Sequence, residues 1–372
     1  MKDVDVLVRG AGIVGQSLAL ALARLGLRVA LRSRPPNPDR PPRPDVRAYA
    51  LSAASVALLR DLKVWDALPV EARTAVDEMQ VHGDAQGAAI GFSAWQQRVG
   101  ELAWITDAAL LEQALAAALR YSPNVERVAD DVPAALTAHC EGRDDAPTRR
   151  ALGIEVERHD YHQTAIAARL TSNRPHAGVA RQWFRAPDVL ALLPFDAPQP
   201  GASYALVWSL PNDRAEALMA LAPAQFEQAL QEATGDPSLA LTLASERASW
   251  PLLRARANRW CGPGWVLLGD AAHVVHPLAG QGLNLGLADV AALAGVVGRR
   301  EPWRPLGDER LLRRYVRERA APTWAMTQAT DALAALFAHP APLARELRNR
   351  GLTLVNQLAP VKRWLTARAL DS

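Results

Sequence analysis

Three glycines near the N-terminus are spaced in a way that can hold a phosphate. Gly10, Gly12 and Gly15 follow the apolar run Val4 to Val8, and an Ala- and Leu-rich segment, 16–25, comes next. The first run is typical of a buried strand and the second of a helix. Glycines between them allow a tight turn, and the N–H groups at the helix N-terminus can then bind a pyrophosphate. The spacing predicts a dinucleotide site; an ordinary structural turn is the alternative.

The second strand of this unit ends unusually. A dinucleotide-binding unit is expected to end it on an acidic residue that holds a ribose, but segment 29–36 reads VALRSRPP and offers Ser33. A serine hydroxyl can still bond a ribose oxygen, without charge. Arg9 also stands directly before Gly10, where an apolar residue is usual. Arg9 and Arg32 could pair with a phosphate, or be solvated. A lost charge-assisted bond is worth roughly 1.5–3 kcal/mol, so we expect weakened binding at this end.

A second stretch, GDAAHVVHPLAGQGLNLGL, could hold a redox ring. We expect a strand to end at Asp270, whose carboxylate can accept hydrogen bonds from a sugar-alcohol chain. Gly280, Gln281 and Gly282 then begin a helix, and a helix N-terminus stabilises negative charge such as that of a reduced flavin. The alternative is an ordinary strand–loop–helix corner.

The elements that must position these residues indicate two joined domains. Segments 52–68, 108–119 and 223–233 are predicted to be helical, while the region 161–250 alternates β-forming residues with breaks, as in an antiparallel sheet. After about residue 250 the strand–loop–helix pattern returns. The first domain is therefore expected to be discontinuous, with a β-rich domain inserted.

Composition excludes several other classes of protein. The 42 basic and 39 acidic residues nearly balance, which is no nucleic-acid signature. Cys140 and Cys261 have no metal-binding spacing, so we expect no metal site and a reducing cytoplasm. The N-terminus carries no signal-peptide pattern, and no apolar run reaches about 18 residues without a charge, so no membrane-spanning helix is expected.

Four segments together resemble one family. HPLAGQGLNLGL resembles the second flavin motif of the class A flavoprotein monooxygenases, and is most similar to the FAD-dependent hydroxylases of ubiquinone biosynthesis, the 2-polyprenyl-6-methoxyphenol hydroxylase type. DVRAYALSAASVALLRDLKVWDAL, DYHQTAIAARLTSNRPHAGVARQWF and LRNRGLTLVNQLAPVKRWLTARAL are similar to that family's Arg-containing segment, the start of its substrate sheet and its C-terminal signature.

The resemblance implies an α/β fold like that of para-hydroxybenzoate hydroxylase. It has a Rossmann-like FAD-binding domain, an inserted antiparallel substrate domain and C-terminal helices. We assign 1–75, 101–155 and 251–335 to the FAD-binding domain, 76–100 and 156–250 to the substrate domain and 336–372 to C-terminal helices.

The same resemblance implies the chemistry. NAD(P)H, a co-substrate, would reduce FAD. Reaction with O₂ would give a flavin C4a-hydroperoxide that hydroxylates a polyprenylated phenol. Carried over by position, Gly10, Gly12 and Gly15 would serve the pyrophosphate and Ser33 the ribose. Arg47, Asp270, Gly280, Gln281, Gly282 and Asn284 would serve the ribityl chain and ring, with Pro277 near the reactive edge.

Two histidines and two aromatic residues have open roles. A histidine near neutral pKa could help to deprotonate a phenol. We name His276 as the catalytic candidate, with hydrogen bonding to loop backbone as the alternative, which is favoured for His273. Trp183 and Phe184 could line a prenyl channel or belong to the core.

Two further departures from the family bear on the nicotinamide route. Segment 124–140 looks too short for the strands the family places there. Glu141 stands where the family has the aspartate of an Asp-Gly motif, and adds a methylene at a crowded turn.

The C-terminal segment 341–372 has six basic and two acidic residues, with leucines near helical spacing and Pro360 as a break. It could pack on the core, rest on anionic lipid or dock to other ubiquinone-biosynthesis proteins. We therefore expect a cytoplasmic location, with membrane association left open.

Two alternative functions also stay open. One is a non-catalytic lipid-binding or scaffold paralogue, and the other is a hydroxylase of a small soluble aromatic compound.

Overall fold

The computed structural model describes residues 4–33, 44–83, 89–142, 146–275 and 281–338. A six-stranded sheet has the order β16, β17, β9, β1, β2, β8. These strands span Cys261–Gly262, Trp265–Leu267, Ala134–His139, Val4–Arg9, Val29–Arg32 and Val125–Val128. The last five run parallel, so their C-terminal ends share one edge, where ligands of such sheets bind. The sheet has helices packed against it, which explains its continuous apolar strands.

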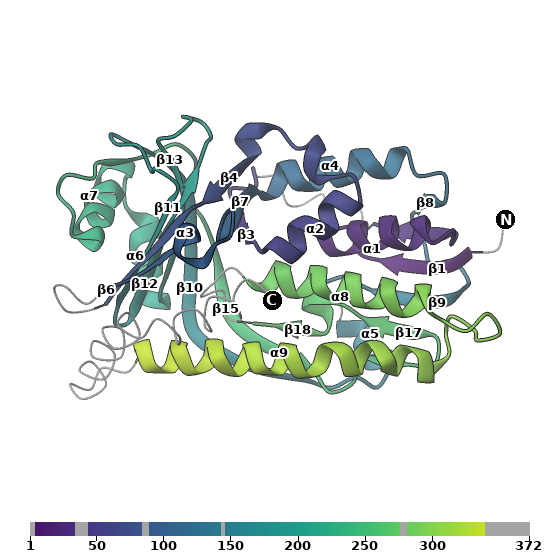
Figure 1. Cartoon of the computed structure of the whole chain (residues 1–372). Helices are drawn as coiled ribbons and strands as arrows, with labels where there is room; N and C mark the ends of the chain where they lie inside the picture. Colours follow the sequence, from purple (N-terminus) through teal and green to yellow (C-terminus); the bar gives the residue numbers. More distant parts are fainter. Residues whose placement is uncertain (1–3, 34–43, 84–88, 143–145, 276–280, 339–372) are drawn as a thin grey trace.

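The helices of this half pack with each other as well as with the sheet. Helix α1 (Ile13–Arg24) packs against both α4 (Ala108–Arg120) and α8 (Gln281–Gly298). Helix α2 (Ala53–Asp61) and the 30-residue α9 (Glu309–Ala338) contact α8 (Figure 1). The short elements α3, α5, η1 and η2 span Ala94–Gln97, Ala146–Ala151, Trp65–Ala67 and Val70–Ala72.

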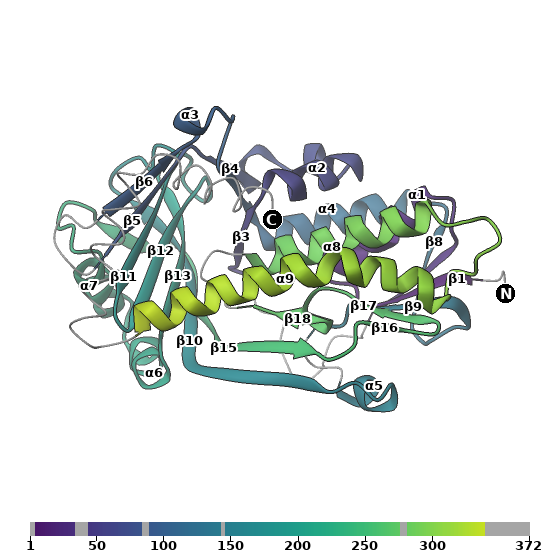
Figure 2. The ribbon, with the colours of Figure 1, turned by 60° about the horizontal axis from the view of Figure 1, so that its bottom comes forward.

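A nine-stranded sheet forms the other half. Its order is β18, β15, β10, β13, β12, β11, β5, β6, with β14 also paired to β10. The strands span His273–Val274, Ala248–Ala257, Val156–Ser172, Ser203–Pro211, Asp188–Phe195, Val179–Arg185, Glu78–His82, Ala89–Ser93 and Leu241–Leu243. Every pair is antiparallel except β11 with β5, which confirms the predicted antiparallel region. Strands β10 and β15 continue beneath the first half (Figure 2).

Helices α6 (Asn212–Ala220) and α7 (Pro223–Thr234) cover one face of this sheet with a core that includes Trp208 and Phe226. The other face is turned toward the first half (Figure 1). There, a small antiparallel sheet of β3 (Ala48–Leu51), β7 (Ala103–Asp107) and β4 (Arg73–Val76) packs against β12. The two halves are thus joined by packed strands as well as by continuous chain.

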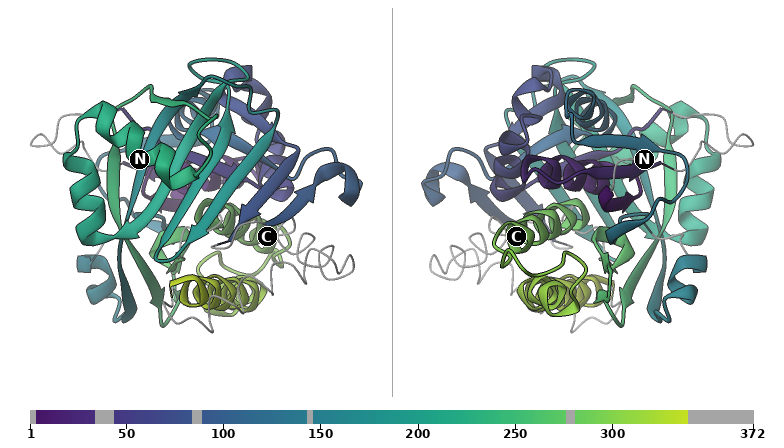
Figure 3. Two further views of the ribbon diagram at one scale, coloured as in Figure 1. Left: turned by 90° about the vertical axis from the view of Figure 1, so that its left-hand side faces the viewer. Right: turned by 90° about the vertical axis from the view of Figure 1, so that its right-hand side faces the viewer.

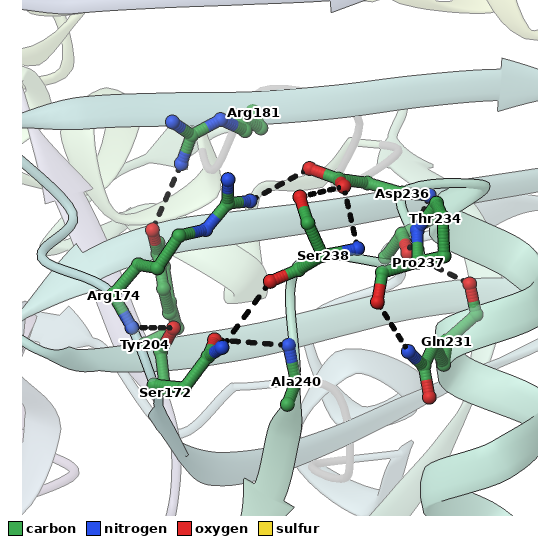
Figure 4. A network of polar contacts seen from close by, with 11 residues as sticks. Ser172, Arg174, Arg181, Tyr204, Gln231, Thr234, Asp236, Pro237, Ser238 and Ala240 are labelled. Carbon is green, nitrogen blue, oxygen red and sulfur yellow. Dashed lines mark hydrogen bonds and ion pairs between the residues drawn. The ribbon is translucent and has the colours of Figure 1, made fainter.

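A polar network closes the outer end of the nine-stranded sheet (Figure 4). The Asp236 carboxylate accepts from the backbone N–H and hydroxyl of Ser238 and from Arg174, 2.7 Å away. The Ser238 hydrogen bond is the main reason that the pKa of Asp236 is lowered. These bonds fix the turn between α7 and β14, far from the shared edge of the parallel strands.

Helix α9 spans both halves, and Figure 3 shows it end-on beside α8. Within its first half Arg319 bonds Asp289 of α8 at 2.8 Å; further along, Asp331 bonds Tyr161 and Arg254 of the nine-stranded sheet. Helix α9, which carries Pro322 between these two anchors, therefore bonds to both halves.

One predicted helix boundary is wrong. Helix α2 ends at Asp61 rather than continuing to residue 68, because Lys63 adopts a left-handed φ of 63° and a 3-10 turn follows. Segment 124–140 forms two strands, β8 and β9; that it is shorter than the same region of the family stays a prediction. The predicted C-terminal helices lie outside the described residues beyond 338. Strand β15 (Ala248–Ala257) crosses the proposed domain boundary at residue 250.

Helix α8 is the one helix of the described residues that is long and apolar enough to cross a membrane. It is instead a core helix: 61% of it is buried inside the molecule, between α1 and α9. Burial on several faces accounts for its composition.

Candidate functional site

The glycine turn after β1 is tightly packed on one side and open on the other. Gly10 has a φ of 103°, and a Cβ there would lie 2.5 Å from the Cys140 carbonyl oxygen. A Cβ on Gly15 would lie 1.8 Å from the Gly10 oxygen, so both positions require glycine. Gly12 is the N-cap of α1 without a side-chain cap, and no described atom lies within 4 Å of its Cβ position. The Gly12 position therefore leaves room for a ligand beside the uncapped N-terminus of α1, as pyrophosphate binding needs.

The second turn begins earlier than predicted. Strand β17 ends at Leu267, and Gly269, with a φ of 58°, starts the 3-10 turn η3 (Gly269–Ala271), which carries the half-exposed Asp270. The prediction of a strand to Asp270 is wrong because this left-handed glycine breaks the extended backbone.

Arg149, which the sequence reasoning missed, holds the η3 turn in place. This buried guanidinium donates to the Gly142 carbonyl at 2.8 Å and lies 3.4 and 3.2 Å from the carbonyl oxygens of Asp270 and Ala271. It thereby joins the turn after β9 to the turn after β17, both of which border the glycine turn.

The start of α8 meets both glycine turns. A Cβ on Gly286 would lie 2.7 Å from the Val14 side chain of α1 and 3.6 Å from Gly269. The absence of a side chain thus lets α1, α8 and η3 touch. Gln281 is buried at the first turn of α8, and Gly282 has no described atom within 4 Å of its Cβ position. His276, Pro277 and Gly280, which precede this helix, lie outside the described residues.

Asn284 is fully used by protein contacts. With 1% of the residue exposed, its Oδ1 accepts from Ser52 N at 3.0 Å and Ser55 Oγ at 2.8 Å, and its Nδ2 donates to the Ala50 carbonyl at 2.8 Å. This side chain ties α8 to β3 and α2. A direct bond from Asn284 to the flavin stays a prediction.

Arg47 lies just before β3 with 44% of its side chain exposed. Asp45 accepts from its guanidinium at 2.6 and 2.8 Å, and this hydrogen bonding raises the pKa of Arg47. Burial opposes ionisation of Asp45, but the bonds from Arg47 outweigh it, so the pKa of Asp45 is lowered. The buried Arg169 of β10 donates to the Arg47 carbonyl at 2.8 Å and to Asp107 at 2.9 Å. The substrate-side sheet therefore supports the backbone of Arg47.

A buried ionic cluster lies behind η3. The Asp289 carboxylate of α8 is 0% exposed and accepts from Gly269 N at 3.0 Å, lies 2.7 Å from His273 Nε2 and accepts from Arg319 at 2.8 Å. Burial alone would raise the pKa of Asp289; the His273 and Arg319 charges and hydrogen bonds lower it. His273 thus bonds a carboxylate of α8 rather than the loop backbone that the sequence favoured.

The end of the site near β2 is charged and more open. Ser33 is half-buried at the end of β2. Arg9 pairs with Asp131 at 3.4 Å and Glu141 at 3.2 Å, and Arg32 with Asp131 at 3.0 Å. With 14% of its side chain exposed, Arg9 is held by carboxylates rather than by solvent.

Both aromatic residues considered for a prenyl channel are buried in apolar clusters. Trp183 packs in the core beneath α6 and α7 and stacks on His82 at 5.5 Å. Phe184 packs with Val81 and Ile90. Both belong to the core, the alternative stated from the sequence. Among the described residues, no group of three or more His, Cys, Asp or Glu could hold a metal ion.

Together these turns fit FAD. Gly10, Gly12 and Gly15 would take the pyrophosphate at the N-terminus of α1, and Asp270, Gln281 and Gly282 the ribityl chain and ring at η3 and α8. The fit rests on the open space before Gly12 and Gly282 and on the contact of both helices with η3. Residue-by-residue ligation stays a prediction.

Comparisons with known proteins agree with this arrangement. An FAD binding domain family model matches residues 111–330. Ubiquinone hydroxylase UbiL of Rhodospirillum rubrum is 33% identical over 100% of this chain and 90% of the relative. The 3-demethoxyubiquinol 3-hydroxylase of Escherichia coli is 31% identical over 99% of each.

Solved structures share the fold. PqsL of Pseudomonas aeruginosa, in complex with 2-aminobenzoylacetate, superposes with a TM-score of 0.76 at 23% identity, covering 95% of this chain and 100% of PqsL. The p-nitrophenol 4-monooxygenase PnpA of Pseudomonas putida gives 0.75 at 17% identity, covering 100% and 99%. The match to the FAD-binding model and the full-length identity to two ubiquinone hydroxylases place this chain in the family of FAD-dependent hydroxylases of ubiquinone biosynthesis.

Proposed function

We propose that this protein uses FAD, NAD(P)H and O₂ to hydroxylate the aromatic ring of a polyprenylated phenol during ubiquinone synthesis. The observation that carries the proposal is the contact of α1, α8 and η3 at Gly286 and Gly269, which brings two helix N-termini and Asp270 to one place. Bound there and reduced by NAD(P)H, FAD would supply the activation of O₂ and the transfer of one oxygen atom.

The residues of this chain would position the cofactor and stabilise charge. The N-terminus of α8 would face negative charge on the reduced ring. Arg149 and Asp289 hold η3 from two sides, through carbonyl oxygens and through Gly269 N respectively. Because these supports are buried, Asp270 is held on a rigid turn, as precise orientation requires.

The nine-stranded sheet supports an apolar substrate. On its face away from α6 and α7, the central strands carry small side chains: Ala165, Ala167, Ala191, Ala205, Val207 and Ser209. These small residues, apolar except for Ser209, leave room for a ring and an attached chain; Leu193 and Phe195 on the same face of β12 add apolar surface. Arg169, on the same face of β10, connects this surface to Arg47.

We also propose that the protein contacts the membrane surface peripherally. A polyprenyl substrate must come from a membrane or a lipid carrier, and the basic segment 341–372 could bind anionic lipid. Co-sedimentation of the full chain and of a variant shortened at residue 340 with anionic vesicles tests it. Equal sedimentation of the two would exclude this role for the segment.

The decisive experiment uses the purified full chain. We expect it to bind FAD, to lose the oxidised flavin absorbance when NADH or NADPH is added without oxygen, and to convert a short-chain prenylated phenol to a product 16 mass units heavier. ¹⁸O₂ should label the product. A protein that takes up no FAD would favour the non-catalytic scaffold, and turnover of small aromatic acids alone would favour the soluble substrate class.

A further inference from the structure

The four neighbouring strand ends beside α1 form one charged group. In the parallel register Arg9 of β1 lies opposite Arg32 of β2 and opposite His139 of β9, and Arg32 lies opposite Val128 of β8. All four positions are at the C-terminal edge of the sheet, the edge that receives ligands. The acid expected at the end of β2 is absent, but the loop after β8 and the turn after β9 bring two carboxylates to this edge: Asp131 and Glu141.

The two carboxylates are not equally available. Glu141 is largely covered: its Oε1 lies 3.2 Å from Arg9 and its Oε2, which is buried, lies 3.6 Å from His139 Nδ1. Asp131 has 51% of its side chain exposed. Both arginines pair with its Oδ1, which lies 3.4 Å from Arg9 Nε and 3.0 Å from Arg32 Nη1. Its Oδ2 has no partner among the described residues.

We propose that Asp131 supplies the carboxylate that binds the adenosine ribose of FAD in this protein, in place of an acid at the end of β2. The inference rests on the FAD binding of the proposed function. A ribose offers hydroxyl donors, and an ionised carboxylate with one free oxygen is the acceptor that such units normally present.

The two arginines make this substitution possible. They fix one oxygen of Asp131, so the side chain loses little freedom when it binds. They also offset its charge, which would otherwise repel the nearby pyrophosphate. Ser33, at the end of the strand between β1 and β8, can add an uncharged hydrogen bond. The Arg–Ser–Arg sequence at the end of β2 is then part of a rearranged ribose site rather than a lost one.

The test compares flavins with and without adenosine. FAD and FMN are titrated into the flavin-free full chain, with flavin fluorescence as the readout. For Asp131→Asn we expect FAD to bind about tenfold more weakly, the effect of one lost charge-assisted bond. FMN affinity should change less than about twofold, because FMN has no adenosine. The neighbouring Asp130→Asn, which changes the same charge in the same loop, is the control and should alter neither.

A second pair of variants separates ribose binding from charge balance. If Asp131 only neutralises Arg32, then Asp131→Asn should be harmless in an Arg32→Gln background; the proposal expects FAD affinity to fall there too. This background also removes one of the two arginines that Asp131→Asn deprives of a partner, while the other, Arg9, keeps Glu141 at 3.2 Å. Ser33→Glu should restore FAD affinity to Asp131→Asn.

Two results would overturn the inference while leaving the function intact: equal FAD affinity in wild type and Asp131→Asn, or equal weakening of FAD and FMN. A wild-type chain that binds neither flavin would overturn the proposed function and this inference together. Thermal melting of each variant shows whether the fold is kept.

Discussion

The two ends of the proposed FAD site are built differently. At the flavin-ring end, η3 and α8 are held by buried groups with several bonds each, Asp289, Asn284 and Arg149. At the adenosine end, Asp131 and Arg32 are partly exposed and paired mainly with each other. The ring end tolerates little change because each buried polar group depends on its partner. The adenosine end can exchange one charged residue for another, because solvent screens it.

This difference indicates which departures from the family are harmful. The unusual Ser33 lies at this partly exposed end, whereas Arg9 and Glu141 pair with each other beside it and have only 14% and 22% of their side chains exposed. Chemistry depends on orientation to within fractions of an ångström at the ring, while the adenosine end contributes mainly affinity. We therefore expect substitutions at the ring end to cost fold stability and those at the adenosine end to change FAD affinity.

The largest expected effect is that of Asp289→Asn. The change leaves Arg319, with 11% of its side chain exposed, charged and without its carboxylate, so we expect a loss of about 3–5 kcal/mol in the free energy of unfolding, measured by urea denaturation. Glu318→Gln, at an exposed position of α9, is the control. A loss below about 1 kcal/mol would show that the ring end is not held by this cluster.

The same cluster predicts a pH dependence. The pKa of Asp289 is lowered in the folded state, so its contribution to stability is present above the ordinary aspartate pKa of about 3.9 and is lost as pH falls through the lower folded value. Urea titrations between neutral and acidic pH should show wild type losing this increment and Asp289→Asn lacking it. Parallel pH profiles of the two proteins would contradict the assignment.

Two glycine substitutions distinguish a position needed for backbone packing from a position needed for FAD binding. In Gly15→Ala the new Cβ meets the Gly10 oxygen, so we expect a stability loss of about 1–3 kcal/mol and at least tenfold weaker FAD. In Gly12→Ala the Cβ meets no described atom, so stability should hold while FAD affinity falls. Gly100→Ala, also without close neighbours, is the control. Unchanged FAD affinity in Gly12→Ala would place the pyrophosphate elsewhere.

Asn284→Ala should have an intermediate effect. It removes the acceptor of Ser52 N and the donor to the Ala50 carbonyl, and an unsatisfied buried group costs about 1–3 kcal/mol. Denaturation compares it with Asn212→Ala at an exposed helix start. If Asn284→Ala instead kept full stability but lost FAD affinity, the side chain would act on the flavin directly.

The smallest effect is a gain at the adenosine end. Ser33→Glu places a carboxylate at the usual ribose-binding position, but Asp131 already stands there in our proposal. We therefore expect FAD affinity to rise by no more than about threefold in the otherwise unchanged chain, measured by fluorescence titration. A tenfold gain would mean that the ribose of the natural protein has no carboxylate partner.

Local patterns predicted much of the fold because they depend on neighbours in the chain. The glycine turn, α1, α4, α7 and the antiparallel middle region follow from periodicity and turn residues. Asp289 is the one charged residue in the apolar helix α8, and this pattern could have predicted a buried ion pair there. Arg149 carried no such signal, since its acceptors Asp270 and Ala271 lie 121 and 122 residues along the chain.

The amino-acid sequence by itself determined the chemistry that this protein can offer. Glycine spacing required close backbone packing at Gly10 and Gly15, and motif order indicated an FAD-dependent hydroxylase. The tertiary structure alone decided which groups meet: that Asp289 holds η3, that Asn284 is used within the protein, and that Asp131 reaches the edge where β2 lacks an acid. The physical reason is that hydrogen bonds and ion pairs form between groups brought close by the packing of distant segments, and no local pattern records that proximity.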